Sequence, residues 1–310
     1  MRTLKAKRDL IWGLVCVCLL GVVLGFWAQS QALVRQNASL KSELASATSK
    51  DDTCQTIGNW KPNQSQEKSV KVAGVPRDYI IHTPDAFKNG RYYPLLVFYV
   101  GRGANAATAE SRYDLDRLPA IIVYPVPTVG GQDQTAWQGA PYSSGADDVA
   151  FTSSILNDIQ TSLCVDQTRV YAAGMSNGGG FVALLGCKLP GRFAAYAITA
   201  GAMYPPESTC VPPKPTPIIA IHGDEDPIVP YFGSLIRQLP PVESWIAMRA
   251  DDNHCGQPVT TYPDANVVAT TWNGCKNGTT VQNLRITGGG HAWGAVSNAT
   301  IWQFLTQFSL

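Results

Sequence analysis

The segment that constrains this chain most is 174–178, Gly-Met-Ser-Asn-Gly, because it fits a turn between a strand and a helix. An apolar run at 169–173 precedes it, and a helix-like run at 181–185 follows it. In such a G-x-S-x-G turn the serine backbone is strained, and the two glycines let the strand and the helix pass without a clash. The serine hydroxyl then lies at a helix N-terminus, where the helix dipole and free N–H groups favour negative charge. The segment therefore predicts an α/β fold with Ser176 as a nucleophile.

A second apolar run, 217–221, ends in a carboxylate-rich loop that supplies a candidate catalytic acid. A buried parallel strand that leads into Gly, Asp and Pro residues places carboxylates at the carboxyl edge of the sheet. Three acids compete there. We expect Asp226 to be the acid, because it lies farthest past the strand and Pro227 fixes the chain after it. Asp224 and Glu225 are interpreted as solvated turn residues.

The candidate base follows a short strand-like segment, 284–287, near the C-terminus. Three glycines at 288–290 lead to His291, and a loop of this composition leaves a histidine free to swing over a nucleophile. The order Ser176, Asp226, His291 matches nucleophile, acid and base in hydrolases with this strand–turn–helix motif. Three other histidines fit less well: His82 precedes the nucleophile, His222 ends a strand and is expected to pack under the site, and His254 lies in a loop beside Cys255.

Backbone N–H groups are expected to stabilise the oxyanion that attack by a serine creates. One is the amide of Asn177, directly after the nucleophile. The other is expected after a third strand at 93–99, where Gly101 and Arg102 lie in a glycine-containing loop that allows close approach to a substrate oxygen. Arg102 is interpreted either as a contact for an acidic substrate group or as a solvated loop residue. Trp293 is interpreted either as a wall of the acyl pocket or as a core residue.

Together these residues resemble the α/β-hydrolase esterases of the polyhydroxybutyrate depolymerase and type C feruloyl esterase group. The resemblance covers about residues 54–310 and rests on the segments 164–166, 169–179, 222–223 with Asp226, 229–231 and 289–293, and on Trp137 with 147–151. It implies an α/β-hydrolase fold, with a mostly parallel central sheet flanked by helices. It also implies serine esterase activity, with Ser176 as nucleophile, Asp226 as acid and His291 as base.

Two positions depart from the family pattern. The family commonly has His-Gly at the end of the third strand, where this chain has Val100-Gly101. Its histidine motif often continues Trp-Pro-Gly, whereas Trp293 is followed here by Gly294. Neither departure removes one of the three candidate catalytic side chains.

The leading interpretation is a serine esterase that hydrolyses carboxylic esters, such as feruloyl, hydroxyalkanoate or other small acyl esters, through an acyl-enzyme. One alternative is a serine peptidase on the same fold. Another is a non-catalytic cell-surface binding protein with a hydrolase-like domain, against which the retention of all three side chains argues. A serine nucleophile with a backbone oxyanion hole needs no metal or organic cofactor, so none is expected. The expected partner is a small-molecule or polymeric ester.

The charge balance argues against one class of partner. Charged residues make up 15% of the chain, below the usual share of about a quarter, and the formal net charge is +1. Basic residues form no run outside the N-terminus. Nucleic acid is therefore not expected as a partner.

The first 32 residues are interpreted as a targeting segment rather than as part of the fold. Four basic residues within 1–8 precede 10–28, which carries no charge and is about as long as a membrane span. Positive charge on that flank keeps the N-terminus in the cytoplasm and sends the rest of the chain outside. We expect a signal anchor at 1–32 with the catalytic domain at 54–310 outside the cytoplasm. A signal peptide cleaved near 30–32 is the alternative, and residues 33–53 are interpreted as a stalk or linker.

The eight cysteines support an exported domain. Two lie in the N-terminal apolar segment, and the other six are expected to form three disulfides in an oxidising compartment, where fifteen pairings are open. The helix after the serine is expected to descend to the edge of the sheet where the preceding helix also ends, which favours one pair. A second pair flanks an expected excursion of strands and turns, and the third follows by elimination. The expected pairs are Cys164–Cys187, Cys255–Cys275 and Cys54–Cys210.

Overall fold

The structure, a computed structural model, describes residues 54–205 and 207–310. The expected targeting segment at 1–32 and the stalk at 33–53 lie outside the described residues. In the part of the chain that is described, we find no helix with the length and apolar character needed to cross a membrane. The fold below is that of the unit formed by residues 54–310.

The strands are β1 (Gln64–Val72), β2 (Val75–Thr83), β3 (Tyr93–Tyr99), β4 (Ile121–Pro125), β5 (Thr128–Val129), β6 (Thr135–Ala136), β7 (Val165–Met175), β8 (Ala195–Thr199), β9 (Ile218–Gly223), β10 (Pro258–Asp264), β11 (Val267–Trp272) and β12 (Val281–Ile286). The helices are α2 (Ala106–Tyr113), α3 (Asp148–Ser162), α4 (Asn177–Lys188), α5 (Val242–Asp252) and α6 (Asn298–Leu305), with short 3-10 helices η1 (Leu115–Arg117), η2 (Gly131–Asp133) and η3 (Lys276–Gly278).

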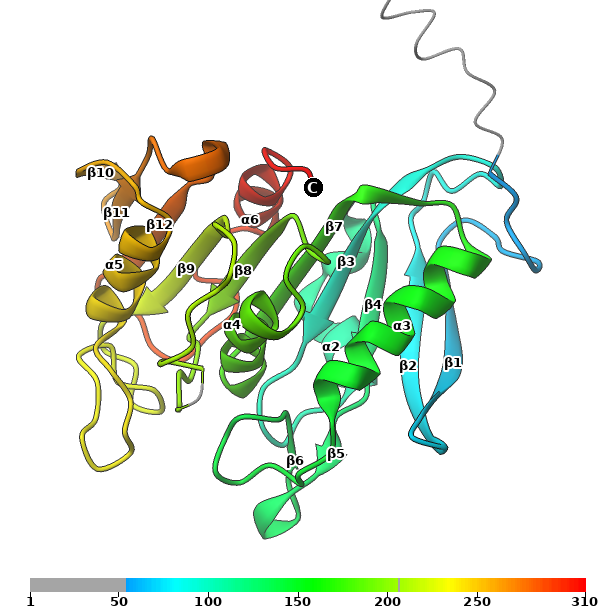
Figure 1. Cartoon of the computed structure of the whole chain (residues 1–310), viewed down its shortest axis with the longest axis horizontal. Coiled ribbons are helices and arrows are strands. Elements are labelled where there is room, and N and C mark those ends of the chain that lie inside the picture. The colour runs from blue at the N-terminus through cyan, green and yellow to red at the C-terminus, as the bar shows by residue number, and fades with distance from the viewer. Residues whose placement is uncertain (1–53, 206) are drawn as a thin grey trace, which may run out of the picture. The chain divides into compact units, whose positions relative to one another are not determined.

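Ten of these strands form one sheet in the order β1-β2-β4-β3-β7-β8-β9-β12-β11-β10 (Figure 1). The six central strands, from β4 to β12 in this order, are all parallel to one another. Antiparallel pairs extend the sheet at both edges. The predicted α/β architecture with a mostly parallel sheet is confirmed. The candidate residues that follow β3, β7, β9 and β12 therefore all lie at the same, carboxyl edge.

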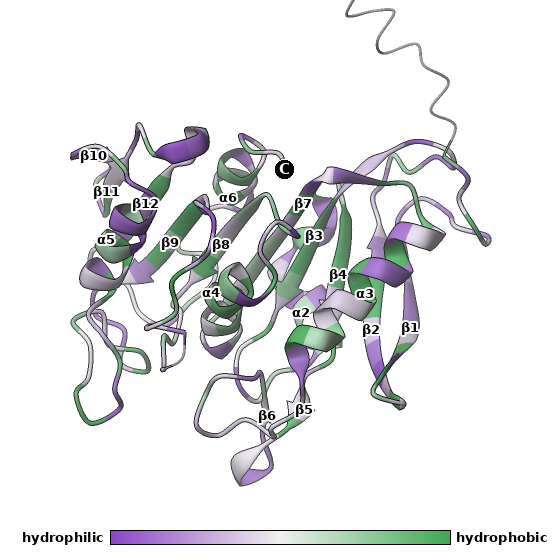
Figure 2. Cartoon of the chain, in the orientation of Figure 1, coloured by the Kyte–Doolittle hydropathy of each residue, from purple (hydrophilic) through white to green (hydrophobic). Residues whose placement is uncertain are grey.

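Long apolar runs make the central strands the core of the fold. Every residue of β3, β4, β8 and β9 is buried. Figure 2 shows these strands as largely hydrophobic, whereas α3 and α5 in front of the sheet also carry hydrophilic residues. Continuous buried runs fit parallel strands that are covered on both faces. In Figure 1 α3, α4 and α5 cover the near face, and α2 and α6 cover the far face.

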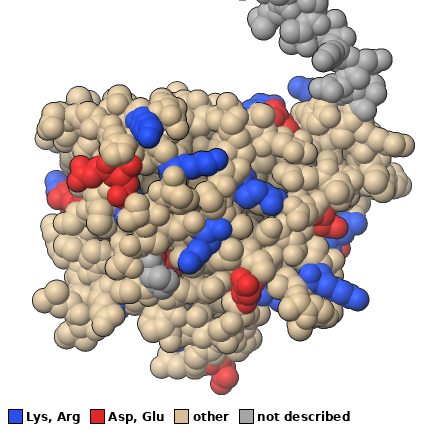
Figure 3. Space-filling view, in the orientation of Figure 1, with Lys and Arg blue, Asp and Glu red and all other residues tan. Residues whose placement is uncertain are grey.

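Basic side chains on the face shown in Figure 3 are scattered among uncharged ones, and several acidic side chains gather near its left edge. Lys and Arg side chains do not merge into a continuous basic surface there. This distribution on the visible face agrees with the small net charge of +1.

Three disulfides link the described residues, and Cys255–Cys275 is one of the expected pairs. It closes the segment that contains the antiparallel hairpin of β10 and β11. The flanking positions of the two cysteines are therefore sufficient to predict this pair.

The expected pair Cys164–Cys187 is wrong, because Cys187 is joined to Cys210. Helix α4 does descend to the amino edge of the sheet, but it packs against β7 and β8, whereas α3 packs against β1 and β7. The two helix ends are therefore displaced sideways. Since β8 and β9 are parallel, the segment between them must return to the amino edge, and it carries Cys210 past the end of α4.

The expected pair Cys54–Cys210 is also wrong, because Cys54 is joined to Cys164. The segment that follows Cys54 lies against the end of α3, where the Ile57 amide donates to the Ser162 carbonyl at 2.9 Å. The N-terminal part of the domain is thereby held at the amino edge of β7.

Candidate active site

Ser176 lies at the turn between β7 and α4, with φ 56° and ψ −123°. A positive φ is strained for a residue with a side chain and is typical of functional turns. The two glycines of the motif are sterically required. A Cβ at Gly174 would lie 2.5 Å from the Gly178 carbonyl oxygen, and a Cβ at Gly178 would lie 2.1 Å from the Tyr99 carbonyl oxygen. The turn thus holds Ser176 at the carboxyl edge, next to the end of β3.

Asp226 follows β9 by three residues and is 4% exposed. Its Oδ2 accepts a hydrogen bond from His291 Nδ1 at 2.7 Å. Its Oδ1 accepts from the backbone amides of Ile228 and Val229, both at 2.8 Å. Burial acts to raise the pKa of Asp226, but hydrogen bonds from His222, His291 and the Val229 amide together hold it well below its usual value. The carboxylate is therefore charged and fixed in orientation.

His291 lies on a loop that is tied to the Asp226 loop by backbone contacts. The Glu225 amide donates to the Gly289 carbonyl at 3.0 Å, and the Gly288 amide donates to Asp224 Oδ1 at 2.7 Å. A Cβ at Gly223 would lie 2.1 Å from the Gly289 carbonyl oxygen, so the two loops cross in direct contact. The glycines therefore allow a close crossing of two loops, whereas the sequence alone suggests a loop that swings.

His222 contacts the carboxylate that the site uses, as its expected place under the site suggests. It is 3% exposed, and its Nε2 donates to the Val229 carbonyl at 2.8 Å while lying 3.3 Å from Asp226 Oδ2. Its position four residues before Asp226 is the sequence signal for this contact. His254, by contrast, is exposed in the loop after α5.

Gly101 is the residue of the β3 loop that lies directly against Ser176. A Cβ at Gly101 would lie 3.2 Å from Ser176 Cβ and 3.8 Å from Ser176 Oγ. The Arg102 guanidinium donates to the Gly131 carbonyl and to Gln132 Oε1, and it lies 4.2 Å from the centre of the Tyr142 ring. That side chain is therefore engaged by the segment around β5 and β6.

Asn177 is fully buried, and its backbone begins α4. Its side-chain Oδ1 accepts from the Trp137 amide at 2.7 Å. The backbone around Ser176 and the segment after β6 are thus joined by a side chain that directly follows the nucleophile.

Trp293 serves as a core residue and also borders an open cleft. Its ring is 7% exposed and packs edge-on against Phe98 and Tyr113, and its Nε1 donates to Asn298 Oδ1 at 2.9 Å. The cleft has a volume of about 720 Å³. It is lined by Arg112, Tyr113, Met175, Ile286 and the loop 289–295, which includes His291 and Trp293.

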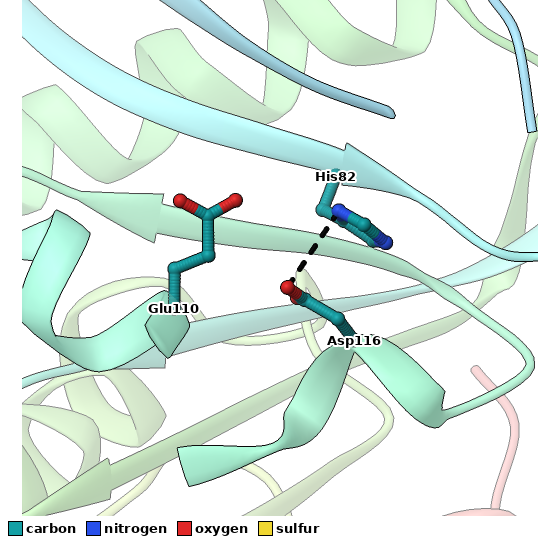
Figure 4. A group of neighbouring side chains, drawn as sticks. All are labelled: His82, Glu110 and Asp116. Carbon is teal, nitrogen blue, oxygen red and sulfur yellow. Dashed lines mark ion pairs between the residues drawn. The ribbon is translucent and has the colours of Figure 1, made fainter. Parts of the chain in front are cut away.

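One group of potential metal ligands occurs among the described residues: His82 on β2, Glu110 on α2 and Asp116 on η1 (Figure 4). One ligand atom from each lies within 4.8 Å of the others. Ser65 bridges His82 and Glu110, and Asp116 accepts from Tyr124 at 2.7 Å. Sequence spacing does not reveal this group, because its members come from three separate elements.

This polar group lies away from Ser176. His82 pairs in register with Ile122, near the beginning of β4 and thus at the amino edge of the parallel strands. Ser176 lies at the carboxyl edge. The group therefore takes no part in the chemistry of the candidate active site.

Comparisons with known proteins find similarity to esterases. The family model of esterase PHB depolymerases matches residues 79–212. Feruloyl esterase B of Piromyces equi is 32% identical over 253 residues, which cover 76% of this chain and 46% of that protein. Probable feruloyl esterase C of Aspergillus clavatus is 28% identical over 206 residues, which cover 59% of this chain and 72% of that protein. The acetyl xylan esterase from Aspergillus awamori has the same fold, with a TM-score of 0.61 at 15% identity over 78% of this chain and 99% of that one.

This chain covers only part of the length of the first two curated relatives. The chain spans 46% of feruloyl esterase B and 35% of the bifunctional acetylxylan esterase/xylanase XynS20E of Neocallimastix patriciarum. The chain thus corresponds to less than half of each of these two proteins.

Proposed function

We propose that this chain, which belongs to the polyhydroxybutyrate depolymerase and type C feruloyl esterase group of α/β-hydrolases, hydrolyses carboxylic esters through an acyl-enzyme on Ser176. The observation that carries the proposal is the 2.7 Å hydrogen bond between His291 Nδ1 and Asp226 Oδ2, at the same sheet edge as a strained serine turn. This is the arrangement of base and orienting acid that activates a serine.

In the first half-reaction Ser176 Oγ attacks the ester carbonyl carbon while His291 Nε2 accepts the hydroxyl proton. Asp226 accepts the hydrogen bond from Nδ1, so it fixes the tautomer of the ring and stabilises the imidazolium that forms. The tetrahedral intermediate then expels the alcohol, which takes the proton from His291. A water molecule repeats the sequence on the acyl-enzyme and releases the acid and the free serine.

The oxyanion of each tetrahedral intermediate is assigned to backbone amides. Asn177 supplies one from the first turn of α4, and Gly101 or Arg102 supplies the second from the loop after β3. The close approach of Gly101 to Ser176 supports this assignment, because a donor must lie within hydrogen-bonding distance of the oxygen bound to the attacked carbon. These groups act without a metal or an organic cofactor.

The proposed substrate is an ester with a small or aromatic acyl group. The 720 Å³ cleft beside His291 supports it, because Tyr113, Met175 and Trp293 give that cleft a partly apolar and aromatic lining. Relatives named as feruloyl and acetylxylan esterases make feruloyl and acetyl esters of polymers or small molecules the first candidates.

We place the catalytic unit outside the cytoplasm, attached to a membrane by the apolar segment 10–28. The three disulfides support the compartment, because such bonds persist in oxidising surroundings. Fractionation of cells that express the full chain tests the attachment. Full-length protein should remain in the membrane pellet after a high-salt wash, and a soluble product that begins near Leu33 would refute the anchor.

The decisive experiment combines fluorophosphonate labelling with a panel of esters and their matching amides. The parent should be labelled at Ser176 and should hydrolyse esters much faster than amides, because an amine leaving group needs more protonation than an alkoxide. Ser176→Ala should lose labelling and about 10⁴–10⁶ in kcat. Retention of hydrolysis within tenfold in Ser176→Ala would refute the nucleophile. Comparable rates on the amides would favour a peptidase, and loss of activity with EDTA would implicate a metal.

A further inference from the structure

We propose that Trp137 is a positioning residue that ties the two backbone segments of the oxyanion hole to each other. This inference rests on the proposed function, since it concerns how the amides after Ser176 and after β3 are held. It goes beyond that function because Trp137 is assigned no step of the reaction.

Trp137 makes hydrogen bonds to both segments at once. Its backbone amide donates to Asn177 Oδ1 at 2.7 Å, and its carbonyl accepts from Asn177 Nδ2 at 3.4 Å. Its indole Nε1 donates to the Val100 carbonyl at 2.8 Å. Asn177 directly follows Ser176, and Val100 directly precedes Gly101. One residue therefore bridges the two places from which the oxyanion donors come.

The indole ring has no freedom to take up another position. It is fully buried, stacked on Phe181 with 5.5 Å between ring centres and edge-on to Tyr99 at 5.1 Å. Phe181 belongs to α4 and Tyr99 to β3, so the same two elements hold the ring that links them. The separation between the two donor segments is thus set by a rigid side chain rather than by a flexible loop.

The hydrogen bond from Trp137 Nε1 to the Val100 carbonyl limits how far the oxyanion donor after β3 can move away from Ser176. Gly101 already lies so close to Ser176 that a Cβ there would be 3.2 Å from Ser176 Cβ. The loop after β3 therefore has no room to move inward. When the indole N–H is removed, the buried Val100 carbonyl loses its partner, and the loop can relax only away from the serine. The expected consequence is a weaker hydrogen bond to the oxyanion, with little change in substrate binding.

Trp137→Phe tests this, because it keeps an aromatic ring between Phe181 and Tyr99 and removes the indole N–H bond together with part of the buried ring volume, a loss that the control below shares. We expect kcat to fall about 10–100-fold with KM changed less than threefold, since displacement of one donor costs part of what its deletion costs. Phenylboronic acid, which adds to the serine as a tetrahedral mimic, should bind weaker by about the same factor as kcat/KM falls. A purely structural role would produce neither a fall in kcat at nearly constant KM nor an equal weakening of boronate binding.

Trp60→Phe is the matched control. Trp60 is 5% exposed and its indole Nε1 also donates to a backbone carbonyl, that of Ile57, at 3.1 Å. Trp60→Phe removes the same kind of hydrogen bond, but in the segment before β1, so its kcat should stay within threefold of that of the parent. The proposal is overturned if Trp137→Phe lowers kcat no more than Trp60→Phe does, or if boronate affinity is unchanged while kcat falls.

Asn177→Ala tests the bridge from its other side, and also serves if Trp137→Phe does not fold. It keeps the backbone amide of residue 177 and removes both bonds to Trp137. Asn177→Ala should likewise lower kcat while it changes KM little. In the double variant that combines it with Trp137→Phe, the loss of kcat should exceed the larger single loss by less than about threefold. Fully additive losses would refute a shared bridge. A parent that cleaves no ester would refute the proposed function, whereas an active parent with an unaffected Trp137→Phe would refute the bridge alone.

Discussion

Asp226 receives His291 Nδ1 on one oxygen at 2.7 Å while its other oxygen is held by the amides of Ile228 and Val229. The carboxylate is thus oriented by its own loop before it orients the histidine. Because the fixed oxygen is charged and buried, replacement of this side chain changes both the tautomer and the angle of the ring.

Asp226→Asn should lower kcat about 10³–10⁴-fold, because an amide that donates to Nδ1 holds the wrong tautomer of His291. Asp224→Asn is the control, since its Oδ1 can still accept from the Gly288 amide and its kcat should stay within threefold. Steady-state kinetics on one ester measure both. Equal losses in the two variants would contradict the assignment of the acid.

His291→Ala and His254→Ala separate the two histidines that follow Asp226 in the chain. His291→Ala should lose about 10⁴–10⁶ in kcat, because no other group can accept the serine proton at that place. His254 is exposed and its substitution should leave kcat within threefold. The reverse ranking would show that the base is wrongly assigned.

Glu207 should make stability depend on pH through a neutral to alkaline window. It is 1% exposed, neither carboxyl oxygen has a hydrogen-bond partner among the described residues, and burial raises the pKa of Glu207 to about 8. Since the unfolded chain releases this proton near its ordinary pKa of 4.5, the folded state binds more protons between about pH 4.5 and 8. Stability should therefore fall as pH rises through that window and level off above it.

Glu207→Gln removes that dependence. At pH 5, denaturant unfolding should give similar free energies of unfolding for the parent and the variant. At pH 9 the variant should be more stable than the parent by roughly 2–5 kcal/mol. Glu225→Gln, at an exposed position, is the control and should show no such growing difference. A constant difference between Glu207→Gln and the parent at both pH values would exclude a buried neutral carboxyl.

Peptide mapping without reduction should find Cys54 with Cys164, Cys187 with Cys210 and Cys255 with Cys275. Each bond is expected to stabilise the fold by about 2–4 kcal/mol, mainly by restricting the unfolded chain. The paired variant Cys187→Ala/Cys210→Ala should unfold at lower denaturant concentration with kcat within threefold. Recovery of a Cys164–Cys187 peptide would contradict the structure.

Local patterns were sufficient to predict the elements that carry the candidate residues. The turn at Ser176, the strand before Gly101 and the strand before His291 follow from apolar runs and glycine spacing, and all occur in the structure. Their meeting at one edge follows from the parallel sheet. These features depend on where each strand begins and ends along the chain, and local patterns of apolar residues and glycines indicate those positions.

Sideways relationships could not be predicted in the same way. The pairings of Cys54 and Cys187 depend on which strands each helix covers, and the bridge from Trp137 to Val100 depends on where a loop returns. The group of His82, Glu110 and Asp116 likewise joins three elements. Lateral packing of this kind leaves no periodic signal in a single sequence.

The Cys54–Cys164 bond has a mechanical consequence. It fixes the first described residue of the chain to the start of β7, whereas Ser176 follows the end of the same strand. A force applied at Cys54 would therefore pass through the disulfide to the start of β7, which is hydrogen-bonded to β3 on one side and to β8 on the other, before it could unravel the segment between Cys54 and β1.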